Sequence, residues 1–410
     1  MSRKISRRTW LKSVGAAGAA GLAGCTGGQG GDGGDGGDGG DGDGGGDGGD
    51  GGSDGSSGDG STGTSTGTAN PETYTMRFGT PWAPWHMEYV PANVLGEYSG
   101  GRGWKGNVEN ESDGRIEMEV HMSGEIGAGT ELARKVQQGT AHMAHVSLSN
   151  LSPYAPEVDL MNLPFFLGVH TDPNELGQAW LDLHTSDPWK NTVNPKVREN
   201  GFIPYYWNQG PRAVNVTERL DEVFVPSDLE GVQFRTGPSD VLNQMFSMVG
   251  ANPSPIAWGE TPQALSEGVA DAMHVMPRAI VIGFQDVITD NYLTNIVEDT
   301  TAYIISRRFY EDLPSDLQDS LDRAAEKTKQ EALEYLIPSR EKVKEDVFAE
   351  NGIENHSLSE DQMAQWEELI SWELSDWDSF KQDFAGDVET AAEIQQGWQD
   401  NESEFRIPGY

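Results

Sequence analysis

An apolar strand that ends in an arginine constrains the fold of this chain more than any other stretch. Val232–Arg235 has the composition of a buried strand, a Gly-Pro turn follows, and Ser239–Val249 has the apolar spacing of a helix. Such a strand places the Arg235 guanidinium at the carboxyl edge of a sheet, where the ligand clefts of α/β folds open. A guanidinium fixed there is a fork-shaped receptor for a carboxylate, and a structural ion pair is the alternative.

Strands alternate with helices after residue 72, which is typical of an α/β fold with mostly parallel sheets. The sequence predicts strands at Tyr74–Gly79, Ile116–Val120, Met143–Leu148, Phe202–Trp207, Ala213–Thr217, Val232–Arg235, Ala270–Val275 and Tyr303–Ser306. It predicts helices at Glu131–Gln138, Asn174–Leu183, Ser239–Val249 and Thr261–Glu267, and along most of the chain from Pro314 onward. About 340 residues are more than one core usually accommodates, so we expect two lobes.

Polar and aromatic residues follow two of these strands at the end where α/β sheets bind ligands. Trp82 and His86 lie in a proline-rich loop after the first strand. Ser147 lies in the last part of the third strand, and Asn150 comes just after it. We therefore expect all four near the ligand. For the aromatic residues, simple packing is the alternative.

A second arginine, Arg212, lies between the strands Phe202–Trp207 and Ala213–Thr217. We expect the strand Ala213–Thr217 to cross from one lobe to the other, with Arg212 beside Arg235 over the cleft. His142 and His145 lack carboxylate neighbours at metal-ligand spacing, so we expect them to be packing or surface residues.

The composition excludes several classes of function. The net charge of −38, from 66 acidic and 28 basic residues, excludes a nucleic-acid partner, because binding a phosphate backbone needs a basic surface. It indicates adaptation to a saline habitat, with an acidic mesophilic surface as the alternative. The folded region has no cysteine, no phosphate-binding loop, no nucleophile elbow and no H-E-x-x-H motif. We therefore expect no metal, no cofactor and no catalysis.

The first 70 residues are predicted to be targeting and linker segments. Residues 1–25 contain the pair Arg7 and Arg8 before a short apolar run that ends at Cys25, and this pattern resembles a twin-arginine lipoprotein signal. Cys25 would carry the lipid that anchors the protein to the membrane. Residues 26–70 consist of Gly, Asp, Ser and Thr, which predicts a disordered tether.

Seven segments of the folded region occur in an order that is similar to one known family. They are Gly114–Val120 (GRIEMEV), Val136–Thr140 (VQQGT), Leu163–Phe166 (LPFF), Trp207–Arg212 (WNQGPR), Asp228–Arg235 (DLEGVQFR), Gly250–Pro255 (GANPSP) and Leu265–Ala272 (LSEGVADA). Together they resemble the extracytoplasmic solute-binding proteins of TRAP (tripartite ATP-independent periplasmic) transporters.

The resemblance implies a two-lobed, type II periplasmic-binding-protein-like fold with hinge strands. Lobe I would comprise about residues 73–208 and 299–335, and lobe II about 209–298. The C-terminal helices, 336–410, would pack across both lobes, and their length is compatible with a homodimer. The implied function is to capture an organic acid and deliver it to the small and large membrane subunits of a permease. A sensor for a membrane receptor, a surface hydrolase and a binding protein of an ATP-driven importer are the alternatives.

The resemblance also assigns roles to individual residues. Arg235 matches the family arginine that pairs with the substrate carboxylate, Arg212 matches a second ligand-contacting arginine, and Trp207 opens the motif that contains Arg212. His274 stands where some members have a glutamate that coordinates a cation. Imidazole is a poor ligand for sodium or calcium, so we expect no metal and instead a hydrogen bond from His274 to the ligand, with packing as the alternative.

Overall fold

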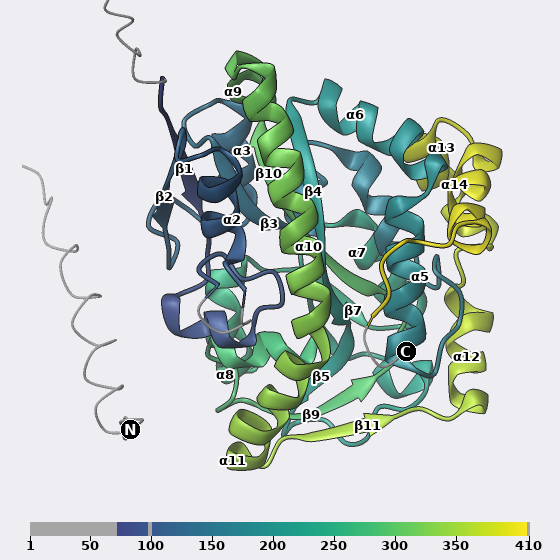
Figure 1. The fold of residues 1–410 in the computed structure, drawn as a ribbon. Coiled ribbons are helices and arrows are strands. Elements are labelled where there is room, and N and C mark those ends of the chain that lie inside the picture. Colours follow the sequence, from purple (N-terminus) through teal and green to yellow (C-terminus); the bar gives the residue numbers. More distant parts are fainter. Residues whose placement is uncertain (1–71, 97–100, 408–410) are drawn as a thin grey trace, which may run out of the picture. The chain divides into compact units, whose positions relative to one another are not determined.

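The computed structural model describes residues 72–96 and 101–407. These residues belong to one compact unit, Ala69–Tyr410, which is drawn as a ribbon in Figure 1. The predicted export pair Arg7 and Arg8, the lipidated Cys25 and the tether 26–70 lie outside the described residues. Within the described ranges, no helix combines the length and the apolar character that crossing a bilayer requires.

Two sheets form the framework of the described unit. The five-stranded sheet has the order β2-β1-β3-β10-β4, and the six-stranded sheet has the order β11-β9-β5-β8-β6-β7. The strands of the first are β1 (Tyr74–Gly79), β2 (Ile116–His121), β3 (Met143–Ser147), β4 (Phe202–Pro211) and β10 (Glu298–Ser306). Those of the second are β5 (Ala213–Thr217), β6 (Gln233–Thr236), β7 (Asn252–Pro255), β8 (Ala272–Val275), β9 (Ile288–Leu293) and β11 (Glu354–Ser357).

Both sheets are mixed rather than mostly parallel. Five of the nine strand pairs are parallel. The antiparallel pairs all involve β10 or β5, each of which lies between two antiparallel neighbours. These two strands enter their sheets directly from the other sheet rather than through a helical crossover, and for that reason they can run antiparallel. The α/β class is confirmed, and the sequence missed β7, β9 and β11.

The chain crosses between the sheets at two adjacent places. β4 ends at Pro211 and β5 begins at Ala213, so Arg212 is the single residue of the first crossing. Residues 294–297 make the return crossing from β9 to β10. The backbone N–H of Arg212 donates to the carbonyl of Val297 at 2.9 Å, so the two crossings are hydrogen-bonded to each other. The lobe boundaries expected from the sequence stay a prediction.

Helices cover both sheets. They are α2 (Gly103–Glu111), α3 (Thr130–Gln137), α4 (Leu148–Leu151), α5 (Pro173–Thr185), α6 (Asn194–Glu199), α7 (Asp240–Met248), α8 (Thr261–Glu267), α9 (Arg307–Asp312), α10 (Ser315–Val343), α11 (Ala349–Asn351), α12 (Glu360–Ile370), α13 (Asp378–Ala385) and α14 (Val388–Asp400). Short 3-10 or π turns are η1 (Pro84–Tyr89), η2 (Pro156–Asn162), η3 (Trp189–Val193), η4 (Pro226–Leu229), η5 (Trp258–Glu260), η6 (Pro277–Ile282), η7 (Lys344–Phe348) and η8 (Ser375–Trp377).

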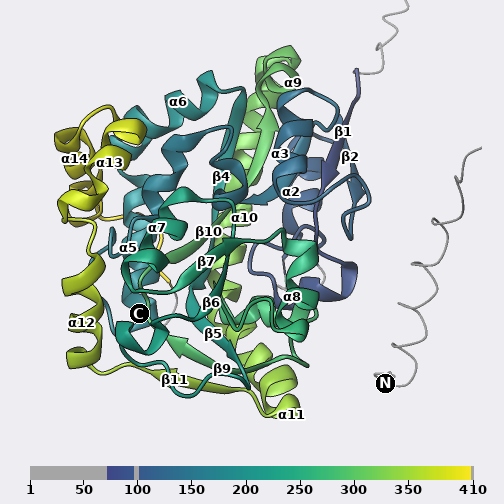
Figure 2. The ribbon, with the colours of Figure 1, turned by 180° about the vertical axis from the view of Figure 1, so that it is seen from behind.

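The C-terminal third of the chain connects the two sheets a third time. Figure 1 shows α10 running past both sheets, from α9 at one end to α11 and β11 at the other. Seen from behind in Figure 2, α12, α13 and α14 line one side of the molecule. α14 packs on α5, and α12 packs on α7. Trp366 and Trp377 are fully buried, as expected for aromatic residues that hold these helices in place.

The strand–turn–helix around Arg235 forms as the sequence predicts. Ser239 begins α7, and its Oγ accepts a hydrogen bond from the backbone N–H of Leu242 at 3.3 Å. Phe234 on β6 stacks on Phe246 of α7, with ring centroids 3.7 Å apart. Because this contact locks β6 against α7, it fixes the backbone from which the Arg235 side chain projects.

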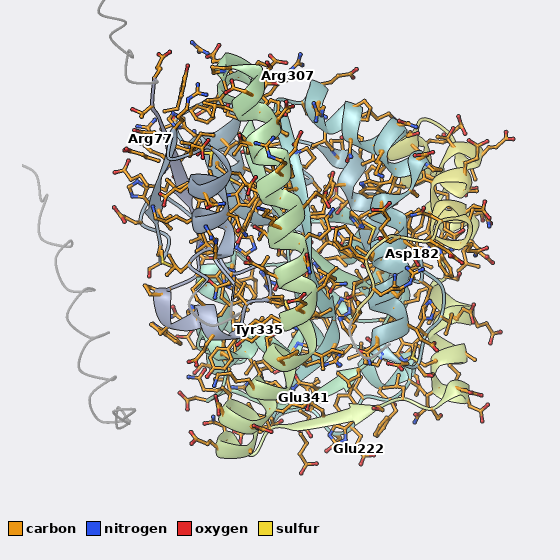
Figure 3. All side chains as sticks on the ribbon, viewed as in Figure 1. Arg77, Asp182, Glu222, Arg307, Tyr335 and Glu341 are labelled. Atoms are coloured by element: carbon orange, nitrogen blue, oxygen red, sulfur yellow. The ribbon has the colours of Figure 1, made fainter. Side chains whose placement is uncertain are left out.

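Charged side chains lie mainly at the periphery, where Figure 3 shows Arg77, Glu222 and Arg307 projecting away from the ribbon. A strongly acidic surface repels itself, and salt screens that repulsion. A strong dependence of stability on salt stays a prediction of the sequence.

We expect Phe234→Ala to lower the free energy of unfolding by about 3–5 kcal/mol, because it deletes a fully buried ring that is stacked on a second one. Denaturant unfolding at fixed molar salt measures this loss. Val269→Ala is the control, since Val269 is 57% exposed. A loss below about 1 kcal/mol for Phe234→Ala would contradict the packing described here.

Candidate functional site

A cavity of about 120 Å³ is lined by residues from both sheets. The walls from the five-stranded sheet come from the loop after β1, from β3 and α4, and from the first residues of β10. The walls from the six-stranded sheet come from β6, β8 and α7. Six residues that the sequence singled out line it together: Trp82, Ser147, Asn150, Arg212, Arg235 and His274.

Two other predicted residues lie outside this lining. Trp207 is 1% exposed and packs edge-on against Trp104 and Tyr303 in the core. His86 lies in η1 against Trp82, at 5.7 Å between ring centroids, and its Nδ1 accepts a hydrogen bond from the backbone N–H of Ala83. Burial lowers the pKa of His86 to about 4, so this ring is neutral near pH 7. In this geometry both side chains pack outside the residues that line the cavity.

Arg235 carries a buried positive charge that no acidic side chain neutralises among the described residues. Its side chain is 6% exposed, and its Nε and Nη2 both donate to the backbone carbonyl of Ile256, at 3.1 and 2.9 Å. Its guanidinium also lies 5.4 Å from the ring centroid of Trp258. Burial and the charge of Arg212 lower the pKa of Arg235 to about 10, so it stays charged near pH 7. Such a charge needs an anion to offset its desolvation.

Arg212, by contrast, already has a carboxylate partner. Its Nη2 and Nε donate to Oδ1 of Asp299 at 2.7 and 3.1 Å, and both side chains are almost fully buried. Asp299 lies on β10, next to the return crossing. The pair therefore ties the two crossings together with a charge-assisted bond, and its net charge at the cavity is zero.

His274 lies on β8 and is 4% exposed. Neither of its ring nitrogens has a hydrogen-bond partner within residues 72–96 and 101–407, although a neutral imidazole offers one donor and one acceptor. Burial and the positive charge of Arg212 hold its pKa well below the ordinary value, so the ring is neutral. A buried ring of this kind that faces a cavity is suited to bind a polar group of a ligand.

A chain of buried hydrogen bonds leads from the crossing to the start of α7. Arg212 Nη2 donates to Ser149 Oγ at 3.3 Å, and Asn162 Nδ2 donates to the same oxygen at 3.4 Å. Asn162 also donates to Oδ1 of Asp159, and Ser239 Oγ donates to Oδ2 of Asp159 at 2.9 Å. Because Ser239 caps α7, this chain links the crossing to the helix that follows Arg235.

The sequence did not single out the other lining residues, among them His145, Asp299 and Trp258. His145 lines the cavity, although it also packs on Trp82 and Tyr303, and its Nε2 has no partner. Asp299 and Trp258 line it as well. The signal for Trp258 was weak: it follows β7, whose carboxyl end lies beside Arg235, but the two prolines of β7 leave that strand without a strand pattern of its own. Sequence spacing carries no such signal for Asp299, which reaches the cavity through a strand pairing with β3 and β4.

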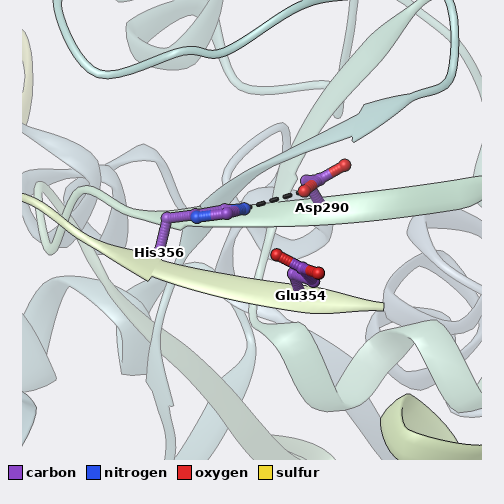
Figure 4. Close-up of side chains that lie close together, drawn as sticks. All are labelled: Asp290, Glu354 and His356. Atoms are coloured by element: carbon purple, nitrogen blue, oxygen red, sulfur yellow. Dashed lines mark hydrogen bonds and ion pairs between the residues drawn. The ribbon is translucent and has the colours of Figure 1, made fainter. Parts of the chain in front are cut away.

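The residues that could hold a metal lie on other strands of the six-stranded sheet. Asp290 on β9 and Glu354 on β11 are register partners, and His356 is two residues further along β11. One potential ligand atom from each lies within 4.8 Å of the others, and His356 Nε2 is 2.7 Å from Asp290 Oδ1 (Figure 4). None of the three lines the cavity. Two of the three, His356 and Asp290, are paired with each other and so tie β11 to β9.

A cavity with a buried, unpaired arginine between two α/β sheets joined by crossing strands defines a two-lobed ligand-binding protein. The chain belongs to the family described as bacterial extracellular solute-binding protein, family 7, whose model matches residues 96–379. This confirms the resemblance to TRAP solute-binding proteins and the two-lobed fold.

Several proteins that are similar to this chain are also solute-binding proteins. A solute-binding protein of Chromohalobacter salexigens is 24% identical over 226 residues, which are 53% of this chain and 63% of that protein, just under two thirds of its length. The C4-dicarboxylate-binding periplasmic protein DctP of Vibrio cholerae is 23% identical over 298 residues, covering 70% of this chain and 82% of that protein. The crystal structure of a TRAP periplasmic solute-binding protein from Roseobacter denitrificans with bound β-D-glucuronate matches with a TM-score of 0.68 at 16% identity, covering 80% of this chain and 100% of that one.

Asp159 makes stability depend on pH in an unusual direction. Burial raises its pKa to about 6, so between roughly pH 4 and 6 the folded state holds a proton that the unfolded state releases. The free energy of unfolding should therefore fall as pH rises through this range, by about 3 kcal/mol from this group.

We expect Asp159→Asn to remove this decrease. The free energy of unfolding of this variant, minus that of the native chain, should therefore rise between pH 4 and pH 7. Denaturant titrations at constant salt measure this difference. Asp319→Asn is the control because Asp319 is exposed. Parallel pH profiles for the native chain and Asp159→Asn would contradict the assignment.

Proposed function

We propose that this protein is the solute-capturing subunit of a TRAP transporter. It binds an organic acid through the carboxylate and delivers it to the small and large membrane subunits of the permease. The observation that carries the proposal is the buried charge of Arg235, which lines the cavity without an acidic partner among the described residues. The printed names of relatives and structural neighbours, which include dicarboxylate- and glucuronate-binding proteins, support the same ligand class.

The donors left on Arg235 suit a carboxylate. A guanidinium has five N–H donors, and the carbonyl of Ile256 takes one from Nε and one from Nη2. The remaining donors are both N–H groups of Nη1 and one of Nη2, which form an end-on fork that matches the two oxygens of a carboxylate. The Ile256 contact fixes the plane of the fork before the ligand arrives, which reduces the entropy lost on binding.

Ligand binding would favour a closed arrangement of the two lobes. Arg235 and His274 project from the six-stranded sheet, whereas Ser147 and Asn150 belong to β3 and α4. A ligand held from both sides binds the closed form more tightly than an open form, and this difference drives closure. The crossings at Arg212 and residues 294–297 are where a hinge would turn. The permease would then recognise the closed form, and a homodimer stays a prediction.

We expect Arg235→Gln to weaken binding of a genuine ligand by about 2–5 kcal/mol, because it removes one partner of a buried charge pair. Calorimetric titration of ligand-free protein against a panel of organic acids measures the loss. Arg307→Gln is the matched control, since Arg307 pairs with Glu311 and projects from the edge of the ribbon in Figure 3. An unchanged Kd for Arg235→Gln would show that this arginine does not bind the ligand.

The predicted lipid anchor has a separate test. We expect Cys25→Ser to release the protein into the medium, because the cysteine thiol is the atom that carries the lipid. Immunoblots of the cell and medium fractions measure the distribution, and Thr26→Ser is the control. Retention of Cys25→Ser on the cell would refute the lipid anchor and would leave the proposed binding function unaffected.

A further inference from the structure

The geometry points to a monocarboxylic acid as the ligand, with an apolar body and one hydroxyl or oxo group that hydrogen-bonds with His274. This inference rests on the proposed function and names the class of acid that the cavity accepts. It follows from three features of the same lining: its net charge, the state of its polar groups and the unpartnered imidazole.

The charge of the lining matches one carboxylate. Its charged side chains are Arg212, Arg235 and Asp299. Arg212 and Asp299 neutralise each other at 2.7 Å, which leaves Arg235 as the single uncompensated charge at the cavity. A second carboxylate on the ligand would lose its hydration on entering the cavity. It would find no uncompensated positive charge there, and the negative Asp299 belongs to the same lining. The desolvation cost of that second charge disfavours a dicarboxylic acid.

The walls suit an apolar body. They include Leu242, Phe246, Val275, Met276 and Ile282, together with two tryptophan rings. A ligand with many hydroxyl groups would bury several of them against these side chains, at a cost of about 1–3 kcal/mol for each one that finds no partner. Sugar acids are disfavoured for this reason.

Most polar groups of the lining already have partners within the protein. Ser149 accepts hydrogen bonds from Arg212 and Asn162, Thr236 donates to Asn243, and Thr301 accepts from Gln209. Ser147 and Asn150 remain as the hydroxyl and amide of the lining without a side-chain hydrogen bond among the described residues. Together with the unpartnered imidazole nitrogens of His145 and His274, these groups are few for the four or more hydroxyls of a sugar acid, which would also meet the apolar walls.

His274 locates the one polar group that the ligand needs beside its carboxylate. β6 and β8 are neighbours, and Arg235 is the register partner of Met273, so His274 is one residue beyond that pair. Both nitrogens of this buried ring lack partners. A hydroxyl can donate to one nitrogen or accept from the other, and an oxo group can accept. His274 and Arg235 line the same cavity of about 120 Å³, so one small acid that carries a hydroxyl or oxo group near its carboxylate can reach both.

Four acids separate the possibilities when titrated calorimetrically into the ligand-free full chain at constant salt. They are 2-hydroxyisocaproate, isocaproate, malate and D-glucuronate. We expect 2-hydroxyisocaproate to bind most tightly, malate and glucuronate about 100-fold or more weakly, and isocaproate about tenfold more weakly. In His274→Phe, the difference between 2-hydroxyisocaproate and isocaproate should disappear, whereas Arg235→Gln should weaken both equally.

The outcomes distinguish this inference from the function on which it rests. Tighter binding of malate or glucuronate that still depends on Arg235 would overturn the ligand class and leave the carboxylate-binding function intact. Equal preference for the hydroxyl in His274→Phe and in the native chain would overturn the role of His274. If none of the four acids bound in an Arg235-dependent way, both the class and the function would be contradicted. Thermal unfolding of His274→Phe checks that the variant is folded.

Discussion

A guanidinium held away from water, with no acidic partner in the described part of the chain, is the constraint on which this structure depends. Desolvating a charge costs several kcal/mol unless a partner replaces the lost water. Arg235 recovers part of that cost from the carbonyl of Ile256 and the ring of Trp258. Both contacts come from the segment after β7, so the strand pairing that completes the sheet also orients the arginine. The remaining cost favours any small anion that can enter the cavity, and the walls decide which one.

The second arginine, Arg212, has a different role from Arg235: it holds the crossing between the two sheets. Arg212 is the sole residue between β4 and β5, and it binds Asp299 beside the return crossing. Through Ser149, Asn162 and Asp159 its hydrogen bonds reach the cap of α7. The crossing and the start of α7 therefore belong to one buried hydrogen-bond network. In such a network, a change in the bonds at one end alters the strength of those at the other. Under the proposed function, this network would couple ligand occupancy to the crossing between the sheets.

The sequence predicted the elements whose signal is local. The strand–turn–helix around Arg235, the helix Thr261–Glu267 and the strands Tyr74–Gly79 and Ala213–Thr217 were placed within a residue or two, because apolar spacing and capping residues mark them. The mixed character of the sheets was not predictable, since it depends on which strands enter directly from the other sheet. The short strand β7, with two prolines in four residues, carries no strand pattern of its own and is held by its pairing with β6.

The residues of the candidate site also divide into those that the sequence could predict and those that it could not. Residues that follow strands, such as Trp82 and Asn150, were predictable from the rule that ligands bind at carboxyl ends. Trp207 and His86 were placed outside the lining, because the face of β4 and the packing of η1 decide where those rings point. The pairing of Arg212 with Asp299, which reduces the charge of the cavity to that of one arginine, joins residues 87 positions apart and is visible only in the fold.

The most direct test of the account is a crystal structure of the protein purified gently enough to keep its natural ligand. The account predicts an acid in the cavity whose two carboxylate oxygens lie about 2.7–2.9 Å from Nη1 and Nη2 of Arg235. A ligand whose anionic group is bound elsewhere, with the Arg235 fork facing only water, would contradict it.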